Sequence, residues 1–243
     1  MDFEPMLEQH IQTGADITIA CRDMSDISVE DQKMLGLVEL NDEGRITDFK
    51  EKSVNPKSTI GSMGVYILRR TFLIDLLQDS AAKGLTDFVY DIIIRQTDNL
   101  KIHAYMFNGY WRPLNSIQLY YRTNMELLNP KVRQELLMDR RKIYTKVKDE
   151  PPAKYNEEAN VHNSIVADGC IIEGTVENSI LFRGVRVMKG VVIKNSLILQ
   201  GTTVERNAHL NYCILDKGVT ITEGKTLNGD VEWPLIVGKN VKV

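Results

Sequence analysis

An internal repeat in the second half of the chain limits its possible folds more than any other feature. Asparagine recurs at Asn163, Asn178, Asn195 and Asn211, in steps of 15, 17 and 16 residues, and a pair of apolar residues follows each one closely. The pieces between them are too short for ordinary sandwich strands. A parallel β-helix of about four coils accounts for the pattern, because glycine and asparagine form its corners and branched side chains stack inside. A β-sandwich is the alternative, and the regular step disfavours it.

The first half of the chain predicts a mixed α/β fold. Apolar residues at helical spacing end at Gly14, and an Asn-Asp-Glu-Gly turn joins two strand-like runs into a hairpin. Ser116 has a side chain that suits a helix N-cap. The predicted helices cover residues 4–12, 71–78, 87–96 and 116–128, and the predicted strands cover residues 17–21, 35–40, 45–49, 62–68 and 101–107.

The strongest boundary signal in the chain is the proline pair at residues 151–152. It follows a stretch, residues 131–148, that contains seven Lys or Arg and only two acidic residues. We interpret this stretch as a solvated linker, and attraction of an anionic metabolite is the alternative. The sequence therefore predicts an α/β domain over residues 1–130, a basic linker over residues 131–155 and a β-helix over residues 156–243.

Charge and hydropathy argue against several classes of function. The formal net charge is −3, from 30 basic and 33 acidic residues, which provides no general attraction to nucleic acid. No run of 18 apolar residues could cross a membrane, and residues 1–5 lack the pattern of a signal peptide. Cys21, Cys170 and Cys213 form neither a CxxC pair nor a zinc pattern. We therefore expect them to be small apolar core residues of a cytoplasmic protein.

Six strings of the sequence resemble one known family. In chain order they are MDFEPMLEQHIQTGADITIA, FKEK, SMGVYIL, TDFVYDII, AYMFNGYW and YYRTNMELL. Their order and spacing are similar to those of the glucose-1-phosphate adenylyltransferases of bacterial glycogen synthesis, over nearly the whole chain. The resemblance implies an α/β fold, an incomplete Rossmann-like nucleotidyltransferase domain followed by a left-handed parallel β-helix. It also implies the reaction of ATP with glucose 1-phosphate to ADP-glucose and pyrophosphate, in which positioning and charge neutralisation dominate.

The resemblance further implies a sugar-phosphate pocket. The residues that fall where the family contacts glucose 1-phosphate are Gly36, Glu51, Lys52, Ser62, Asp87 and Phe88. A lysine ammonium suits the phosphate, and a carboxylate can accept hydrogen bonds from sugar hydroxyls. From the residues alone, Glu51 and Lys52 would be a solvated strand edge, and Asp87 and Phe88 would be a helix cap and a core residue. Ser53 departs from the family pattern, which has proline there.

The family's catalytic groups are mostly absent from this sequence. It contains no glycine-rich basic loop of the kind that holds a triphosphate, so the resemblance implies a chain truncated at its N-terminus. The family's tryptophan motif continues with an acid that helps to hold magnesium, whereas Trp111 is followed here by Arg112 and Pro113. We therefore expect no catalytic residue, metal ligand or cofactor in this chain, although the family reaction uses magnesium. Trp111 itself is interpreted as a core aromatic.

This pattern resembles the family's D-type subunit of glycogen synthesis, which pairs with a catalytic subunit and modulates it. The resemblance implies a catalytic adenylyltransferase subunit as partner, in a heterotetramer, with sugar phosphate as a further ligand and with neither nucleic acid nor membrane. Three alternatives stay open. They are an active nucleotidyltransferase in a longer chain, a β-helix acyltransferase with His162 or His209 as general base, and a pure assembly module.

Overall fold

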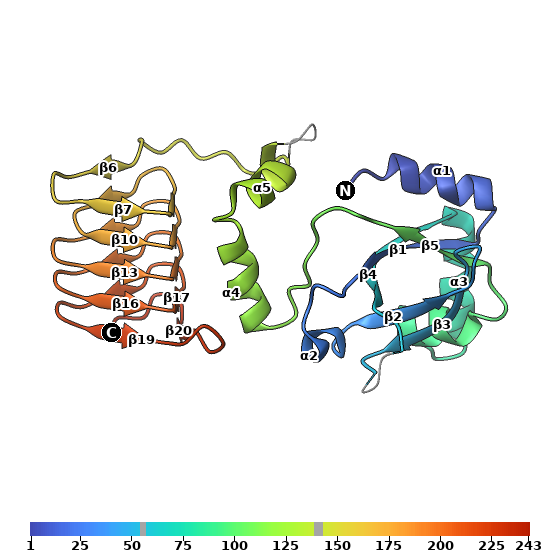
Figure 1. Ribbon diagram of the computed structural model, residues 1–243. Helices are drawn as coiled ribbons and strands as arrows, with labels where there is room; N and C mark the ends of the chain where they lie inside the picture. Colours follow the sequence, from blue (N-terminus) through green and yellow to red (C-terminus); the bar gives the residue numbers. More distant parts are fainter. Residues whose placement is uncertain (54–56, 139–142) are drawn as a thin grey trace. The chain divides into compact units, whose positions relative to one another are not determined.

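The computed structural model describes residues 1–53, 57–138 and 143–243. The chain forms two compact units, Met1–Gly109 (unit 1) and Tyr110–Val243 (unit 2), and each is described by itself (Figure 1). Residues 139–142 of the predicted basic linker lie outside the described part of the chain. Within the described ranges, no helix combines the length and the apolar character needed to cross a membrane.

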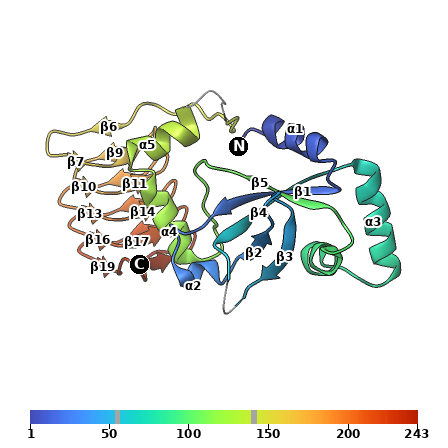
Figure 2. The same cartoon turned by 45° about the vertical axis from the view of Figure 1, so that its right-hand side comes forward.

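Unit 1 contains a five-stranded mixed sheet in the order β3-β2-β4-β1-β5 (Figure 2). Strand β1 pairs antiparallel with β4 and parallel with β5. The strands are β1 (Ile17–Asp23), β2 (Gly36–Leu40), β3 (Ile46–Glu51), β4 (Ile60–Leu68) and β5 (Ile102–Met106). The helices are α1 (Glu4–Thr13), α2 (Val29–Gln32), α3 (Arg70–Ala82), a π-helix η1 (Phe88–Ile93) and a 3-10 helix η2 (Ile94–Gln96). Apolar side chains of β1, β2, β3, β5 and η1 form the core.

Local signals in the sequence account for the first helix and the hairpin. Helix α1 ends where Gly14 takes a left-handed backbone with φ of +58°, as predicted. The β2–β3 hairpin turns at Asn41, whose side-chain oxygen accepts hydrogen bonds from the N–H groups of Glu43 and Arg45. These contacts are local in the chain, and for this reason the residue types alone were sufficient to predict both elements.

The helix predicted over residues 87–96 has irregular geometry. The π-helical turn η1 is followed by the 3-10 turn η2, and the two replace one regular α-helix. The carboxylate of Asp91 accepts hydrogen bonds from the backbone N–H groups of Thr86 and Asp87, at 3.1 Å each. These hydrogen bonds satisfy N–H groups that precede the helix, and the apolar periodicity does not reveal the π-helical and 3-10 geometry that follows.

Unit 2 contains the parallel β-helix that the repeat predicts. Three five-stranded parallel sheets form its faces, so it has five coils (Figure 1). The first face contains β6 (Lys154–Tyr155), β9 (Ile171–Ile172), β12 (Arg186–Val187), β15 (Thr203–Val204) and β18 (Thr220–Ile221). The second contains β7 (Asn160–His162), β10 (Thr175–Glu177), β13 (Val192–Lys194), β16 (His209–Asn211) and β19 (Thr226–Asn228). The third contains β8 (Ile165–Val166), β11 (Ile180–Leu181), β14 (Leu197–Ile198), β17 (Cys213–Leu215) and β20 (Leu235–Val237).

The asparagine series marks one corner of the coils, with a shift in the fourth repeat. The residues with left-handed backbones at this corner are Asn163, Asn178, Asn195 and Tyr212, with φ of 41°, 47°, 47° and 51°. Asn211 is in register with Lys194, one position before the corner. Its side chain still accepts a hydrogen bond from the amide of Asn195, at 3.0 Å. The fourth asparagine therefore keeps the side-chain ladder but not the corner position.

Helix α4 (Ile117–Glu126) packs against the outside of the β-helix. Ser116 caps it by accepting a hydrogen bond from the N–H group of Leu119, as predicted. Tyr121 is 3% exposed and packs with Ile180 and Leu197, and its hydroxyl donates to the carbonyl of Asn195 at 2.6 Å. Helix α4 thus belongs to the compact unit 2, together with α5 (Pro130–Arg133) and η3 (Gln134–Met138).

The three cysteines are free and buried, which confirms their predicted place among core residues. Burial raises the pKa of the Cys21 thiol to about 12 and that of the Cys213 thiol to about 11. A thiol with so high a pKa carries little thiolate at neutral pH, so these side chains act as small apolar groups.

Two buried histidines lie along the same sheet face of unit 1. His10, on α1, is 8% exposed, and its Nδ1 lies 2.8 Å from the hydroxyl of Thr18. Thr18 is paired in register with His103 on β5, which is 5% exposed. The Nδ1 atom of His103 is buried and has no hydrogen-bond partner within the described part of the chain. Protonation would place a charge in this buried layer.

Both imidazoles have a lowered pKa. For His10 the main cause is burial, followed by the charge of Arg69, and Asp16 opposes them. For His103 the main cause is again burial, followed by Lys101 and Arg45, and Glu43 opposes them. Burial and these charges together leave the neutral forms of both rings favoured in the folded state.

Unit 1 should lose stability as the pH falls below the ordinary histidine value of 6.5. The unfolded chain binds protons there while the folded state does not, so the stabilisation is present above that pH and is lost below it. Pulse proteolysis in urea, mapped to peptides of unit 1, should show a lower midpoint at about pH 5.5 than at about pH 7.5. Replacing both rings (His10→Gln with His103→Gln) should remove most of this difference, and the exposed His209→Gln should not. Equal midpoints at both pH values would contradict the prediction.

Candidate functional site

The six predicted sugar-phosphate residues all lie in unit 1, on neighbouring elements. Gly36, at the start of β2, is the register partner of Glu51, at the end of β3. Ser62 lies on β4, directly after Gly61, which pairs with β2. Asp87 and Phe88 form the start of η1. Strand pairing therefore brings together residues from three segments that are separate in the sequence.

Packing and backbone contacts position the residues of this group at the start of β2 and at the end of β3. A Cβ atom on Gly36 would lie 2.5 Å from the Phe49 ring, so this position needs a residue without a side chain. The backbone N–H of Lys52 donates to the carbonyl of Leu35 at 3.0 Å, and Lys52 has a left-handed backbone with φ of +52°. Glu51 and Lys52 are both exposed. The backbone at Lys52 is thus held in a defined turn, and the side chains of Glu51 and Lys52 are open to a ligand.

Tyr66 on β4 connects the members of the group and was not among the residues predicted from the sequence. Its ring meets Phe88 edge to face, with centroids 5.4 Å apart, and its hydroxyl lies near the side chain of Ser62. Burial is the main cause of its raised pKa, and the nearby carboxylates of Glu51 and Asp87 raise that pKa further. Alternation along the strand was the available signal, because residues 62 and 66 share a face in the SMGVYIL run.

Asp87 and Phe88 have the structural roles that the sequence also allowed. The Asp87 carboxylate caps η1 by accepting a hydrogen bond from the N–H of Tyr90 at 2.7 Å. Phe88 packs against the unit 1 core. Asp87 is nevertheless exposed, and its charge lies near enough to raise the pKa of Tyr66. A ligand contact at Asp87 stays a prediction.

The tryptophan motif lies in unit 2 and forms a polar cluster with α4. The Tyr110 hydroxyl donates to the Glu126 carboxylate at 2.7 Å, and Arg112 forms an ion pair with that carboxylate at 3.1 Å. The Arg112 guanidinium also stacks over the Tyr110 ring, 5.2 Å from its centroid. Pro113 is buried, and Trp111 is only half-buried, so the predicted core role describes Trp111 in part.

The donor groups near this motif do not fit a magnesium ion. A proline side chain offers no oxygen to a hard cation, and the Glu126 carboxylate is already used by two partners. Among the residues with described positions, no group of three or more His, Cys, Asp or Glu side chains could hold a metal ion. His162 and His209 lie on the second face of the β-helix, at different positions of their strands.

Comparison with known proteins gives the class of the molecule. Residues 1–130 match the nucleotidyl transferase family, and residues 151–233 match the GlmU-like C-terminal hexapeptide family. The chain therefore belongs to the nucleotidyl transferase family. The expected fold, a Rossmann-like nucleotidyltransferase sheet followed by a left-handed β-helix, is confirmed.

Similarity to named proteins indicates which members of the nucleotidyl transferase family the chain resembles. The chain is 45% identical to the glycogen biosynthesis protein GlgD of Bacillus subtilis over 180 residues, which is 74% of this chain and 52% of that protein. It is 36% identical to the glucose-1-phosphate adenylyltransferase of Geobacillus stearothermophilus, over 80% of this chain and 50% of that enzyme. The enzyme of the same name from Bacillus subtilis is 37% identical, over 98% of this chain and 63% of that enzyme. The expected resemblance to these adenylyltransferases and to the D-type protein is confirmed, and the chain spans about half the length of the curated relatives it matches.

Proposed function

We propose that this chain acts in glycogen biosynthesis as a non-catalytic, modulatory subunit that joins a catalytic glucose-1-phosphate adenylyltransferase in a heterotetramer. The observation that carries the proposal is Pro113, a buried ring at the position where the resemblance implies a magnesium-holding acid. The 45% identity to a protein named for glycogen biosynthesis, and not for an enzymatic activity, supports it. The proposed role does not require this chain to bind magnesium.

The group around Tyr66 supports binding of glucose 1-phosphate as the ligand of this subunit. Lys52 would neutralise the phosphate as a compact positive charge, and the Glu51 carboxylate would accept hydrogen bonds from sugar hydroxyls. Ser62 and Tyr66 would orient the sugar, because their hydroxyls lie near each other on the same strand. Binding without turnover would let the ligand influence the partner only through a difference in affinity between two states of the assembly.

The proposal predicts the outcome of a reconstitution. The purified chain should release no pyrophosphate from ATP and glucose 1-phosphate when it is alone. Added to the catalytic adenylyltransferase of the same organism, it should change the rate of pyrophosphate release or its response to effectors, and the mixed species should elute as one hetero-oligomer. An unrelated hexapeptide-repeat protein, added in equal amount, is the control. Turnover by the chain alone would contradict the non-catalytic role, and an unchanged rate and effector response would contradict the modulatory role.

A further inference from the structure

One corner of the β-helix is shorter in the second coil than in all the others. Strand register places four residues between the first and second faces in the other coils, at 156–159, 188–191, 205–208 and 222–225. In the second coil only residues 173–174 lie there. This missing pair explains why the first step of the asparagine series is 15 residues and not 17.

The short corner is recessed against the coil below it. Gly174 is buried, and a Cβ atom at this position would lie 2.5 Å from the carbonyl oxygen of Val191 and 3.0 Å from that of Met188. The longer corners before and after it, residues 156–159 and 188–191, extend past it on either side. A deletion in the sequence therefore becomes a recess between two projecting turns.

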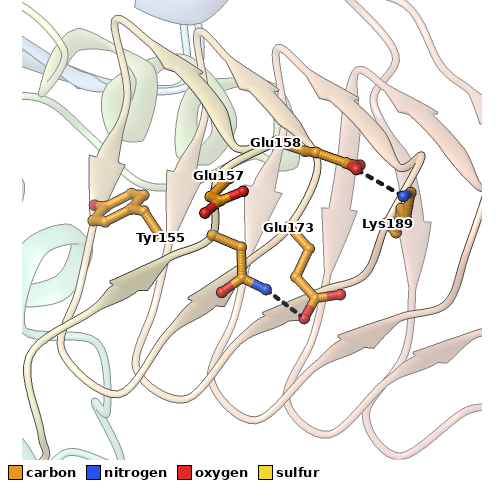
Figure 3. Close-up of a pocket in the computed structure, with 6 residues that line it drawn as sticks. Tyr155, Glu157, Glu158, Glu173 and Lys189 are labelled. Atoms are coloured by element: carbon orange, nitrogen blue, oxygen red, sulfur yellow. Dashed lines mark hydrogen bonds and ion pairs between the residues drawn. The ribbon is translucent and has the colours of Figure 1, made fainter.

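This recess is a hollow of about 510 Å³, which we call the corner notch. Its volume lies within the roughly 300–1,000 Å³ that is usual for small-molecule sites. The lining residues are Tyr155, Asn156, Glu157, Glu158, Glu173 and Lys189 (Figure 3). Tyr155 stands at one end of the notch and Lys189 at the other, with Glu157 and Glu173 between them.

Contacts between coils hold the polar walls of the notch. The Asn156 amide donates to the Glu173 carboxylate at 2.9 Å. The Lys189 ammonium forms an ion pair with Glu158 at 2.7 Å, and this pair spans the short second coil from the first coil to the third. Both contacts leave further hydrogen-bonding capacity, because each carboxylate has a second oxygen and the ammonium has further protons.

The chemistry of the lining favours a neutral ligand with many hydroxyl groups. The lining has three carboxylates and one ammonium, and that ammonium is already paired with a carboxylate. Its net negative charge therefore disfavours an anion such as a sugar phosphate. The carboxylates offer acceptors, while Asn156 and Lys189 offer donors, so a hydroxyl group could both donate and accept along the notch. Tyr155 is 51% exposed, and its ring provides an apolar surface on which the C–H face of a sugar ring can lie.

We propose that the corner notch is a binding site for a neutral saccharide, separate from the sugar-phosphate group of unit 1. The inference does not depend on the proposed function, because it rests on residues 155–191 alone. The irregular step in the repeat, the recess at Gly174 and the mixed aromatic and polar lining together define the site.

Titration of the full chain with maltotriose, followed by calorimetry and by amide chemical shifts, tests the proposal. Maltotriose should bind and should shift amides of residues 155–158 and 173. Tyr155→Ala should weaken binding by at least about tenfold through loss of the stacking surface, and Tyr155→Phe should retain most of it. Glu157→Gln should weaken binding less, because an amide still accepts one hydrogen bond. Glu223→Gln, at the same corner of the last coil, is the matched control and should bind like the parent.

A second variant tests the geometry. Inserting two residues between Glu173 and Gly174 restores a four-residue corner, which should fill the notch and abolish maltotriose binding. Its circular dichroism and its glucose 1-phosphate titration should match the parent, which keeps the outcome independent of the site in unit 1. Absence of maltotriose binding by the parent chain would overturn the proposal. So would binding of spermidine in its place, which would indicate a site for cations, or shifts confined to unit 1.

Discussion

Replacing Leu181 by alanine should lower the free energy of unfolding of unit 2 by about 2–5 kcal/mol. Leu181 is fully buried in the stacked interior of the β-helix, between coils that cannot collapse into the space its side chain would leave. Urea unfolding followed by tryptophan fluorescence reports on this unit, because Trp111 and Trp233 both belong to it.

Leu114→Ala is the matched control for this prediction. The chemical change is the same, but Leu114 is 62% exposed in the segment before α4. Its free energy of unfolding should stay within about 0.5 kcal/mol of the parent value. Equal losses for the two variants would mean that the interior of the β-helix is not closely packed.

Glucose 1-phosphate should bind roughly ten- to a hundredfold more weakly to the Lys52→Ala variant, in line with the loss of a charge-assisted hydrogen bond. The ammonium of Lys52 is exposed at a turn that a backbone hydrogen bond to Leu35 holds in place. Calorimetric titration of the full chain measures the change, and it tests the binding half of the proposed function without any turnover.

Lys50→Ala is the control for the loss of one positive charge elsewhere in unit 1. Lys50 lies on the same strand, and its ammonium is paired with Asp48 at 2.8 Å. Adjacent strand residues point to opposite faces, so Lys50 does not share the side of Glu51. Affinity for glucose 1-phosphate should change little in this variant. Similar losses for both variants would show that only the overall charge of unit 1 matters.

Elements with contacts between near neighbours were predicted well from the sequence. The Asn41 turn and the Ser116 cap depend on hydrogen bonds within a few residues, so the residue types themselves carry the information. The positions of the pocket residues, in contrast, came from resemblance to a family. Strand register is the reason that Gly36, Glu51 and Ser62 lie together, and register between distant segments is not visible in local patterns.

Three features escaped the sequence analysis, each for a physical reason. Tyr66 was missed because its importance comes mainly from its ring contact with Phe88, which a separate segment contributes. The π-helical and 3-10 geometry of residues 88–96 was missed because apolar periodicity does not distinguish it from a regular α-helix. The packing of α4 on the β-helix depends on a match between its apolar face and the outer side chains of three coils.

The sequence by itself determined that the second half of this protein is a β-helix. Each coil needs the same types of corner and interior residue, so these types recur at regular steps along the chain. It also determined that a proline stands where the resemblance implies a metal-holding acid. Only the tertiary structure decided what the one irregular step means, since the two residues absent from the second coil become a hollow only when the longer corners of its neighbours are stacked on either side. Stacking brings together residues from three coils, and the sequence pattern of a single coil does not show which residues of its neighbours lie beside it.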